Sequence, residues 1–401
     1  MRLQELNIIA GQRVLLRVDY NVALDAGRVA EPKRIDATLP TLKWLLEKKA
    51  SVIICSHLGR PNGWEPKYSL RPVVDELNQI LRREKLPVTA CSLWDKPYPS
   101  PELAERAKTL QPGEILVLEN LRFHAGEEKN DADLARGLAQ LGEVFVQEAF
   151  GALHRAHAST DALPRLMAKR AFGFLVAKEL DTLGALLTNP SKPFVVLLGG
   201  VKVSDKIGAI ENLLNRGVDK ILIGGALAYT FLKSQGHEVG NSPVEEKWVP
   251  RVKELLARQN GSSRIVLRKD HWIAQGLDRP QGAKVTENPG VPSGWEGLDV
   301  GPKTLDVFSR EINNAKTIFW NGPVGVIEVP PFDRGSSALA RLIAERTKAG
   351  ALTVLGGGDT IHAVSKAGVP EGSFSHVSTG GGATLEFLEG KTLPGVAAIA
   401  G

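Results

Sequence analysis

The chain has 401 residues, of which 43% are hydrophobic and 24% are charged, values typical of a globular protein long enough for two domains. The formal net charge of +5 is modest, and Lys and Arg are scattered without a long basic run, so we expect a solvated basic surface and no nucleic-acid partner. No apolar stretch reaches the ~18 residues that a membrane-spanning helix needs, so we expect no membrane partner either.

The first half of the chain alternates strands with helices. We predict strands over 13–18, 51–55, 114–118 and 144–147, and helices over 37–49, 71–83 and 131–141. Continuous apolar strands separated by helices indicate parallel pairing, with both faces of the sheet covered. The sequence therefore predicts an α/β domain.

A helix over 174–188 has no turn signal until Asn189-Pro190-Ser191, and we expect it to join two domains. After Pro193 the alternation of strands and helices resumes and continues to Leu388. Residues 395–401 form a small-residue tail. In open parallel sheets ligands collect at the carboxyl ends of the strands, so these loops are the expected working surface.

Arginine and histidine follow the strands of the first half. The motifs are Arg17-Val18-Asp19-Tyr20-Asn21, Ser56-His57-Leu58-Gly59-Arg60-Pro61, Glu119-Asn120-Leu121-Arg122-Phe123 and His154-Arg155-Ala156-His157, and Arg34 precedes the first helix. Guanidinium groups at neighbouring strand ends converge, and each binds carboxylate or phosphate in a planar fork. These residues favour a site for a small polyanion; the alternative is a set of weak surface ion pairs.

Glycine clusters follow the strands of the second half, at 199–200, 224–225, 356–358 and 380–382. Glycine lets a phosphate approach the backbone, and the helix that follows presents free N–H groups to it. Lys202 and Lys206 would share one face if both are helical. Asp359 is either a helix cap or a Mg²⁺ ligand beside nucleotide phosphates. Glu328 follows the motif Trp320-Asn321-Gly322-Pro323-Val324-Gly325 and is placed to hydrogen-bond a ribose.

Two other classes of protein remain as alternatives. Strand–glycine–helix junctions also serve nicotinamide-dependent dehydrogenases, but the G-x-G-x-x-G fingerprint does not occur. A non-enzymatic nucleic-acid binder is suggested only by the basic pI of about 9.1. Cys55 and Cys91 make neither a disulfide framework nor a zinc site, and Cys55 is expected to be a buried thiol. The first residues lack secretory or transit character, so we expect a cytoplasmic protein.

In this order, these motifs resemble the phosphoglycerate kinase family over essentially the whole length of the chain. Ala149-Phe150-Gly151 before His154 and Ser378-Thr379-Gly380-Gly381-Gly382 belong to the same resemblance. It implies two doubly wound, Rossmann-like domains joined by a hinge helix. The implied parts are a phosphoglycerate-binding domain over 1–173, a hinge over 174–190, a nucleotide-binding domain over 191–388 and a tail over 389–401 that returns to the first domain.

The resemblance also implies the reaction and its residues. The activity is reversible phosphoryl transfer from 1,3-bisphosphoglycerate to MgADP, giving 3-phosphoglycerate and ATP, by a monomer. The implied phosphoglycerate site is Asp19, Asn21, Arg34, His57, Leu58, Gly59, Arg60, Arg122 and Arg155. The implied nucleotide site is Gly200, Lys202, Lys206, Gly225, Gly294, Asn321, Glu328, Gly357, Gly358, Asp359 and Thr360, with Asp359 reaching the metal. Catalytic roles fall to Arg34, Lys202, Gly357 and Gly381.

Four positions depart from the family pattern. Ala23 stands where proline is common, Glu148 where aspartate is common, Val201 where a small residue is usual, and Ile327 where phenylalanine is frequent. We expect Val201 and Ile327 to alter the shape of the nucleotide pocket. None of the four removes a charged catalytic group.

Overall fold

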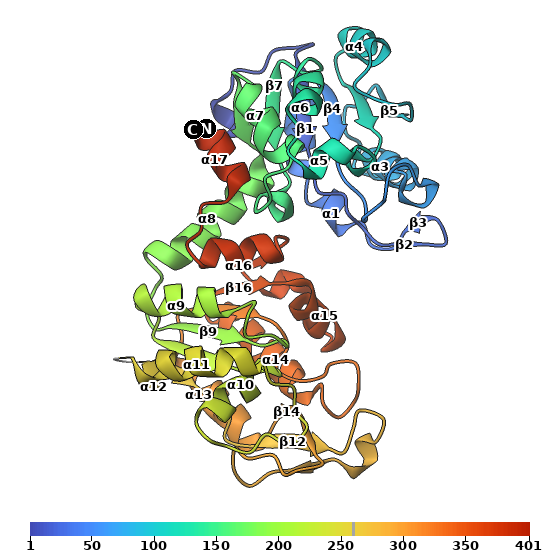
Figure 1. Cartoon of the computed structure of the whole chain (residues 1–401). Coiled ribbons are helices and arrows are strands. Elements are labelled where there is room, and N and C mark those ends of the chain that lie inside the picture. The colour runs from blue at the N-terminus through green and yellow to red at the C-terminus, as the bar shows by residue number, and fades with distance from the viewer. Residues whose placement is uncertain (259–260) are drawn as a thin grey trace. The chain divides into compact units, whose positions relative to one another are not determined.

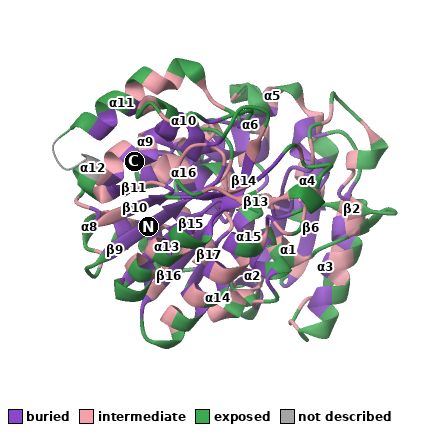
Figure 2. Cartoon of the chain, turned by 90° about the horizontal axis from the view of Figure 1, so that it is seen from below, coloured by how far each residue is buried: buried purple, intermediate pink, exposed green. Residues whose placement is uncertain are grey.

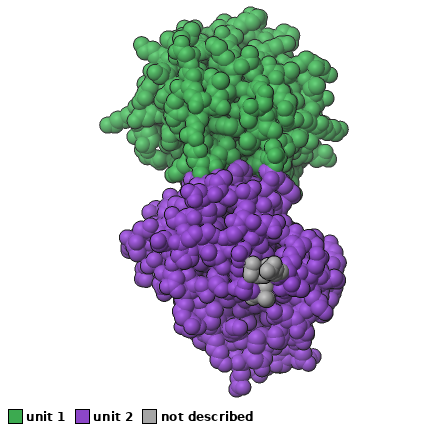
Figure 3. Space-filling view, turned by 90° about the vertical axis from the view of Figure 1, so that its left-hand side faces the viewer, with its two compact units in different colours: residues 1–181, 392–401 green, residues 182–391 purple. Residues whose placement is uncertain are grey.

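The computed structural model describes residues 1–258 and 261–401. The chain divides into two compact units (Figure 3). Unit 1 is Met1–Asp181 with Thr392–Gly401, and unit 2 is Thr182–Lys391. The boundary between them falls inside helix α8 (Phe174–Thr188), whose bounds are those expected from the sequence.

Unit 1 holds, in the described part of the chain, a sheet of six parallel strands in the order β5-β6-β4-β1-β7-β8. The strands are β1 (Arg13–Arg17), β4 (Ser51–Cys55), β5 (Ala90–Trp94), β6 (Glu114–Leu118), β7 (Val144–Gln147) and β8 (Arg170–Phe172). A small hairpin, β2 (Leu24–Asp25) with β3 (Arg28–Val29), follows β1. The central strands are buried because their apolar runs face helices on both sides.

The helices of unit 1 are α1 (Lys33–Asp36), α2 (Leu39–Glu47), α3 (Arg71–Arg83), α4 (Pro101–Lys108), α5 (Ala125–Glu128), α6 (Ala132–Ala139), α7 (Leu163–Leu166) and α17 (Pro394–Ala400). Two of them are shorter than predicted: α2 against 37–49, and α6 against 131–141. Helix α6 begins after Asp131 because this side chain accepts from Leu134 N–H and caps the helix. The small-residue tail is helical from Pro394, and α17 packs against α7 in Figure 1.

Unit 2 holds, among its described residues, a second sheet of six parallel strands in the order β11-β10-β9-β15-β16-β17. The strands are β9 (Phe194–Leu198), β10 (Lys220–Ile223), β11 (Ile265–Val266), β15 (Thr317–Asn321), β16 (Leu352–Gly356) and β17 (His376–Ser378). In chain order this is the doubly wound arrangement, in which the strand order reverses between β9 and β15. The predicted fold class is confirmed.

The helices of unit 2 are α9 (Ile207–Asn215), α10 (Leu227–Ser234), α11 (Val249–Ala257), α12 (Gly261–Arg264), α13 (Pro302–Asn314), α14 (Arg334–Lys348), α15 (Gly358–Lys366) and α16 (Gly382–Leu388). Strands β9, β10 and β15 are buried among them, whereas α11 also shows an exposed face (Figure 2). The core includes Trp320, Phe308 and Leu355, which are 0% exposed.

Part of unit 2 departs from the predicted alternation. The strands β12 (His271–Ala274), β13 (Lys284–Val285) and β14 (Glu296–Val300) form an antiparallel sheet in the order β13-β12-β14. Helix α9 begins at Ile207, so Lys202 and Lys206 both precede it and do not share a helical face. No helix among the described residues combines the length and the apolar character that a bilayer crossing requires.

Candidate active site

Asp19, directly after β1, is the centre of a charged cluster in unit 1. Its carboxylate pairs with Arg34, Nη1 to Oδ2 at 2.5 Å, and its Oδ1 lies 3.9 Å from His57 Nδ1. Arg17 Nη2 lies 3.4 Å from the same ring nitrogen. Burial opposes ionisation of Asp19, but the neighbouring cations outweigh it and lower its pKa.

His57 is a neutral imidazole at pH 7. Burial, together with the positive field of the arginines, lowers its pKa to about 3, against the opposing pull of Asp19. His57 and Asp19, 3.9 Å apart, therefore do not form an ion pair at neutral pH. His57 can act as a hydrogen-bonding group toward an anion, but it adds no positive charge of its own.

The loops after β1, β4 and β6 are tied to one another by hydrogen bonds. Gly59 N–H donates to Asn21 Oδ1 at 2.8 Å, and Arg122 Nη1 donates to the Gly59 carbonyl at 2.6 Å. Leu58 N–H donates to Asn120 Oδ1 at 3.1 Å. Gly59 has φ +63°, and a Cβ there would lie 2.4 Å from the Tyr68 ring, so this turn requires glycine.

Arginine outnumbers its carboxylate partners along this edge of the sheet. Burial lowers the pKa of Arg122, and the nearby charge of Arg155 adds to the effect. Arg122 pairs with Glu128, Nε to Oε1 at 3.2 Å, and Arg155 Nε donates to His154 Nε2 at 3.1 Å. Arg60 is exposed, and in the described part of the chain no hydrogen bond or ion pair joins its side chain to the other predicted residues. A bound anion would relieve the repulsion among these cations.

A buried polar network, absent from the predicted site, lies behind the cluster. Arg17, 1% exposed, donates from Nε to Ser159 Oγ at 2.8 Å, and Ser159 Oγ donates to Glu127 Oε1 at 2.6 Å. Glu127 Oε1 is 4.0 Å from Arg17 Nη2. Arg17 closes the first strand motif, whereas nothing in the sequence near Glu127 or Ser159 signals that they meet it.

In unit 2, three glycine loops interlock where the strand order reverses. Gly199 N–H donates to the Asn321 carbonyl at 2.9 Å, and Gly200 N–H donates to the Pro323 carbonyl at 3.0 Å. Gly225 has φ +58°, and a Cβ there would lie 2.3 Å from the Gly200 carbonyl oxygen. A side chain at Gly199 or Gly225 would clash with the neighbouring loop, so at these two positions the backbones approach one another directly.

Lys206 lies beneath the loops and is largely buried. Its Nζ donates to Asn321 Oδ1. Burial lowers the pKa of Lys206 to about 8, against the opposing pull of Asp205 and Asp359. The ammonium is charged at pH 7 and is close to its titration range, as expected of a group that gains from a bound anion.

Gly357 is the N-cap residue of α15 and has φ +91°, a conformation that favours glycine. Gly358 is the first helical residue. Asp359 lies exposed in the first turn and does not cap the helix, which excludes the capping alternative. Thr360 is buried; its Oγ1 donates to the Gly356 carbonyl at 2.7 Å and accepts from Gly322 N–H at 2.6 Å. It therefore ties α15 to the loop after β15.

Gly381, with φ +51°, precedes α16 in the same way. The remaining predicted nucleotide residues Lys202, Glu328 and Gly294 are not buried. Lys202 follows Gly200 in the loop after β9, but among the described residues no hydrogen bond or ion pair joins Lys202, Glu328 or Gly294 to the glycine loops. Their roles depend on the resemblance alone.

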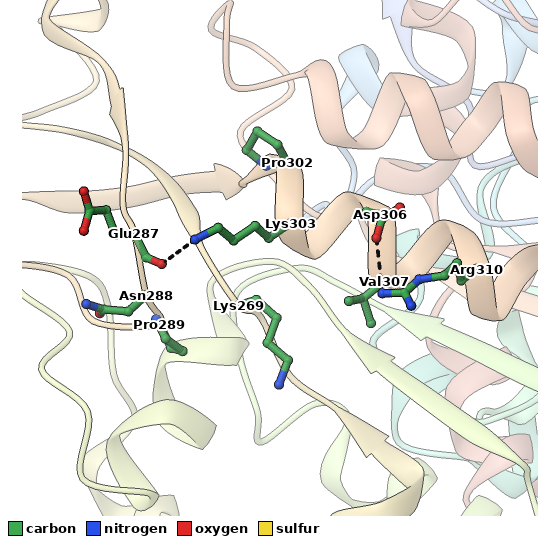
Figure 4. A pocket seen from close by; sticks show the side chains of 9 residues that line it. All are labelled: Lys269, Glu287, Asn288, Pro289, Pro302, Lys303, Asp306, Val307 and Arg310. Atoms are coloured by element: carbon green, nitrogen blue, oxygen red, sulfur yellow. Dashed lines mark hydrogen bonds and ion pairs between the residues drawn. The ribbon is translucent and has the colours of Figure 1, made fainter.

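A cavity of about 640 Å³ lies elsewhere in unit 2, at the start of α13 (Figure 4). Lys303 Nζ donates to the Glu287 carbonyl there at 2.8 Å, and Arg310 pairs with Asp306 at 3.1 Å. None of its lining residues is among the predicted site residues. The predicted residues instead follow the carboxyl ends of the parallel strands.

The fold defines the class of this protein: an α/β protein of two parallel-sheet units with polar and glycine loops at the strand ends. The family model described as "Phosphoglycerate kinase" matches residues 3–391. A phosphoglycerate kinase of Thermus thermophilus is 49% identical over 394 residues, which covers 98% of this chain and 97% of that protein. The phosphoglycerate kinase of Chloroflexus aggregans is 48% identical over 393 residues, 97% and 96% of the two chains.

Solved structures agree. Phosphoglycerate kinase from Coxiella burnetii aligns with a TM-score of 0.86 at 36% identity, covering 100% of this chain and 98% of that one. The chain belongs to the phosphoglycerate kinase family, and the predicted resemblance is confirmed. It is a phosphotransferase, and its reaction is the glycolytic transfer of a phosphoryl group between 1,3-bisphosphoglycerate and ADP.

Proposed function

We propose that unit 1 binds the triose acid and unit 2 binds the nucleotide in this reaction. The supporting observation is that Asp19, Arg34, His57 and Arg122 converge at one carboxyl edge, whereas bare glycine loops meet at the other. Converging guanidiniums suit the phosphate and carboxylate of a small acid. A glycine surface followed by a helix N-terminus suits a nucleotide phosphate chain.

The attacking group in the direction of 3-phosphoglycerate phosphorylation is a carboxylate. It is already ionised at neutral pH, so no general base is needed, and a neutral His57 agrees with this. Catalysis then consists of positioning and of stabilising the charge on the transferred phosphoryl oxygens. We assign this stabilisation to Arg34 and Lys202, with the helix starts at Gly357 and Gly381.

Mg²⁺ fits the residues at the start of α15. Asp359 is an exposed carboxylate next to Gly358, where a Cβ would meet nothing within 4 Å, and Mg²⁺ commonly uses one or two carboxylates together with phosphate oxygens. Bound there, the ion would neutralise charge on the nucleotide phosphates. Lys206, which titrates near pH 8, would hold the phosphates from the protein side.

Transfer requires the two bound substrates to come within bonding distance and water to be excluded. Since we place them on different units, we expect a hinge movement in α8, where the boundary between the units falls. Because residues Thr392–Gly401 belong to unit 1, the chain passes between the two units twice, once in α8 and once before Thr392. We further propose that the enzyme is a cytoplasmic monomer.

A coupled assay of ATP plus 3-phosphoglycerate, with and without Mg²⁺, tests the reaction and the metal. A crystal soaked with both substrates tests their places. We expect the triose acid beside Arg34 and Arg122, and the nucleotide beside Gly200 and Gly357. Both compounds on one unit, or an unoccupied arginine cluster, would overturn the assignment.

A further inference from the structure

Unit 2 contains a buried guanidinium, that of Arg268, which has no part in the predicted site. It follows β11 and is 2% exposed. Its Nη2 donates to the carbonyl of Gly225 at 2.6 Å and to that of Val324 at 2.7 Å. Its Nη1 donates to the hydroxyl of Tyr229 at 2.8 Å. The buried cation therefore bonds to three neutral oxygens.

The charge of Arg268 forms no ion pair among the described residues, although the buried carboxyl of Asp299 is near enough to interact with it electrostatically. Among the described residues no carboxylate oxygen lies within the 4.0 Å ion-pair distance of this side chain. A buried charge is costly unless its donors are used, and hydrogen bonds from an ionised donor are roughly twice as strong as neutral ones. The stabilisation that offsets the burial of Arg268 therefore includes its charged hydrogen bonds to the two backbone carbonyls and to the Tyr229 hydroxyl.

Those carbonyls belong to two of the interlocked glycine loops. Gly225 ends the β10 loop in a left-handed conformation, and its N–H donates to the Val324 carbonyl at 3.1 Å. Arg268 bonds to both loops at once. Gly225 and Val324 are buried, so water would not readily replace the lost donor. Glycine also loses more conformational freedom on ordering than other residues, which makes such a restraint effective.

We propose that Arg268 is a positioning residue for the nucleotide, which holds the β10 and β15 loops in the conformation that binds it. This inference rests on the proposed placement of the nucleotide in unit 2. Arg268 itself touches no substrate in this scheme. It acts by preorganising backbone that would otherwise have to be ordered when the nucleotide binds.

The test uses the full chain with Arg268→Met and Arg268→Lys. Arg346→Met is the matched control, because Arg346 Nη2 also donates to a carbonyl, that of Ala315, but at the amino-terminal end of β15. The dissociation constant of MgADP is measured by calorimetric titration, alongside steady-state kinetics. We expect Arg268→Met to raise this constant and the nucleotide KM by ~10-fold or more, since the two charged hydrogen bonds that hold the loops are lost together with the one to Tyr229.

In Arg268→Met, kcat and the Michaelis constant for the triose acid should change far less. Arg268→Lys should restore part of the MgADP affinity. Arg346→Met should bind MgADP as the wild type does. A folded Arg268→Met protein with unchanged MgADP affinity would overturn the inference. So would a lower kcat with unchanged nucleotide KM, which is the signature of a purely structural role. If Arg268→Met does not fold, the Arg268→Lys affinity decides in the same way. A wild-type chain that does not bind MgADP would instead overturn the proposed nucleotide site.

Discussion

Replacing Arg34 by alanine separates catalysis from stability. The Arg34 side chain is 38% exposed, and its ion-pair partner is Asp19, 13% exposed, at 2.5 Å. The pair is partly buried on the Asp19 side, so we take the upper end of the range for exposed ion pairs, about 1 kcal/mol. Arg17 still acts on Asp19 after the change, so the carboxylate is not left without a nearby cation. We therefore expect the melting temperature to fall by no more than about 4 °C.

The effect on the rate should be much larger. If Arg34 stabilises charge on the transferred phosphoryl group, its loss should lower kcat by roughly 10²–10³, as for other preorganised donors. Arg34→Lys keeps the charge but not the planar fork, so it should lie between wild type and alanine.

The assay is the coupled measurement of ATP plus 3-phosphoglycerate at saturating concentrations of both, with thermal unfolding followed on the same samples. Arg71→Ala is the matched control, because Arg71 also forms an exposed ion pair in unit 1, with Asp95 at 2.8 Å, but outside the cluster. Its kcat should equal that of the wild type. A folded Arg34→Ala enzyme with kcat within about threefold of wild type would refute the catalytic role. It would also show that the roughly 10²–10³ rate loss seen for other preorganised donors does not apply to this side chain.

Three further predictions concern titration and glycine. Because the pKa of Lys206 is about 8, the nucleotide KM should rise ~10-fold by pH 9 as the ammonium is lost, and Lys206→Arg should remove this rise in a KM–pH profile. Burial raises the pKa of Glu148 to about 7, above its ordinary value of 4.5. The protonated form therefore contributes its full stabilisation below pH 4.5, and this contribution is lost as the pH rises through 7. Between those pH values the unfolding free energy of the wild type should fall, relative to Glu148→Gln, by on the order of 3 kcal/mol in urea titrations; parallel pH profiles would contradict the assignment. Gly225→Ala should raise the nucleotide KM, because its Cβ would lie 2.3 Å from the Gly200 carbonyl oxygen. It should also destabilise unit 2 by more than the ~1–2 kcal/mol that a left-handed alanine costs. The control is Gly236→Ala, with φ +85° and nothing within 4 Å of its Cβ, which should show only that backbone cost and an unchanged KM.

Local sequence patterns determined the central strands. The ranges 51–55, 114–118 and 144–147 agree with the prediction, because a strand buried on both faces is a continuous apolar run. The edge strand β5, with its partly exposed residues, lacks such a run, and β8 has only three residues. The pattern predicts neither of them, and it misses the antiparallel sheet of β12, β13 and β14 because it assumes alternation with helices throughout.

Sequence alone also establishes which residue types follow each strand, and therefore the chemistry at each edge. It does not establish which loops meet, since that depends on strand order. Gly200 contacts the Pro323 loop only because β9 and β15 are neighbours where the winding reverses. Arg268 shows the limit most clearly: its neighbours in sequence carry no signal, and only the packed structure places its guanidinium under two glycine loops. Backbone carbonyls have no sequence signature, so contacts to them are decided in three dimensions.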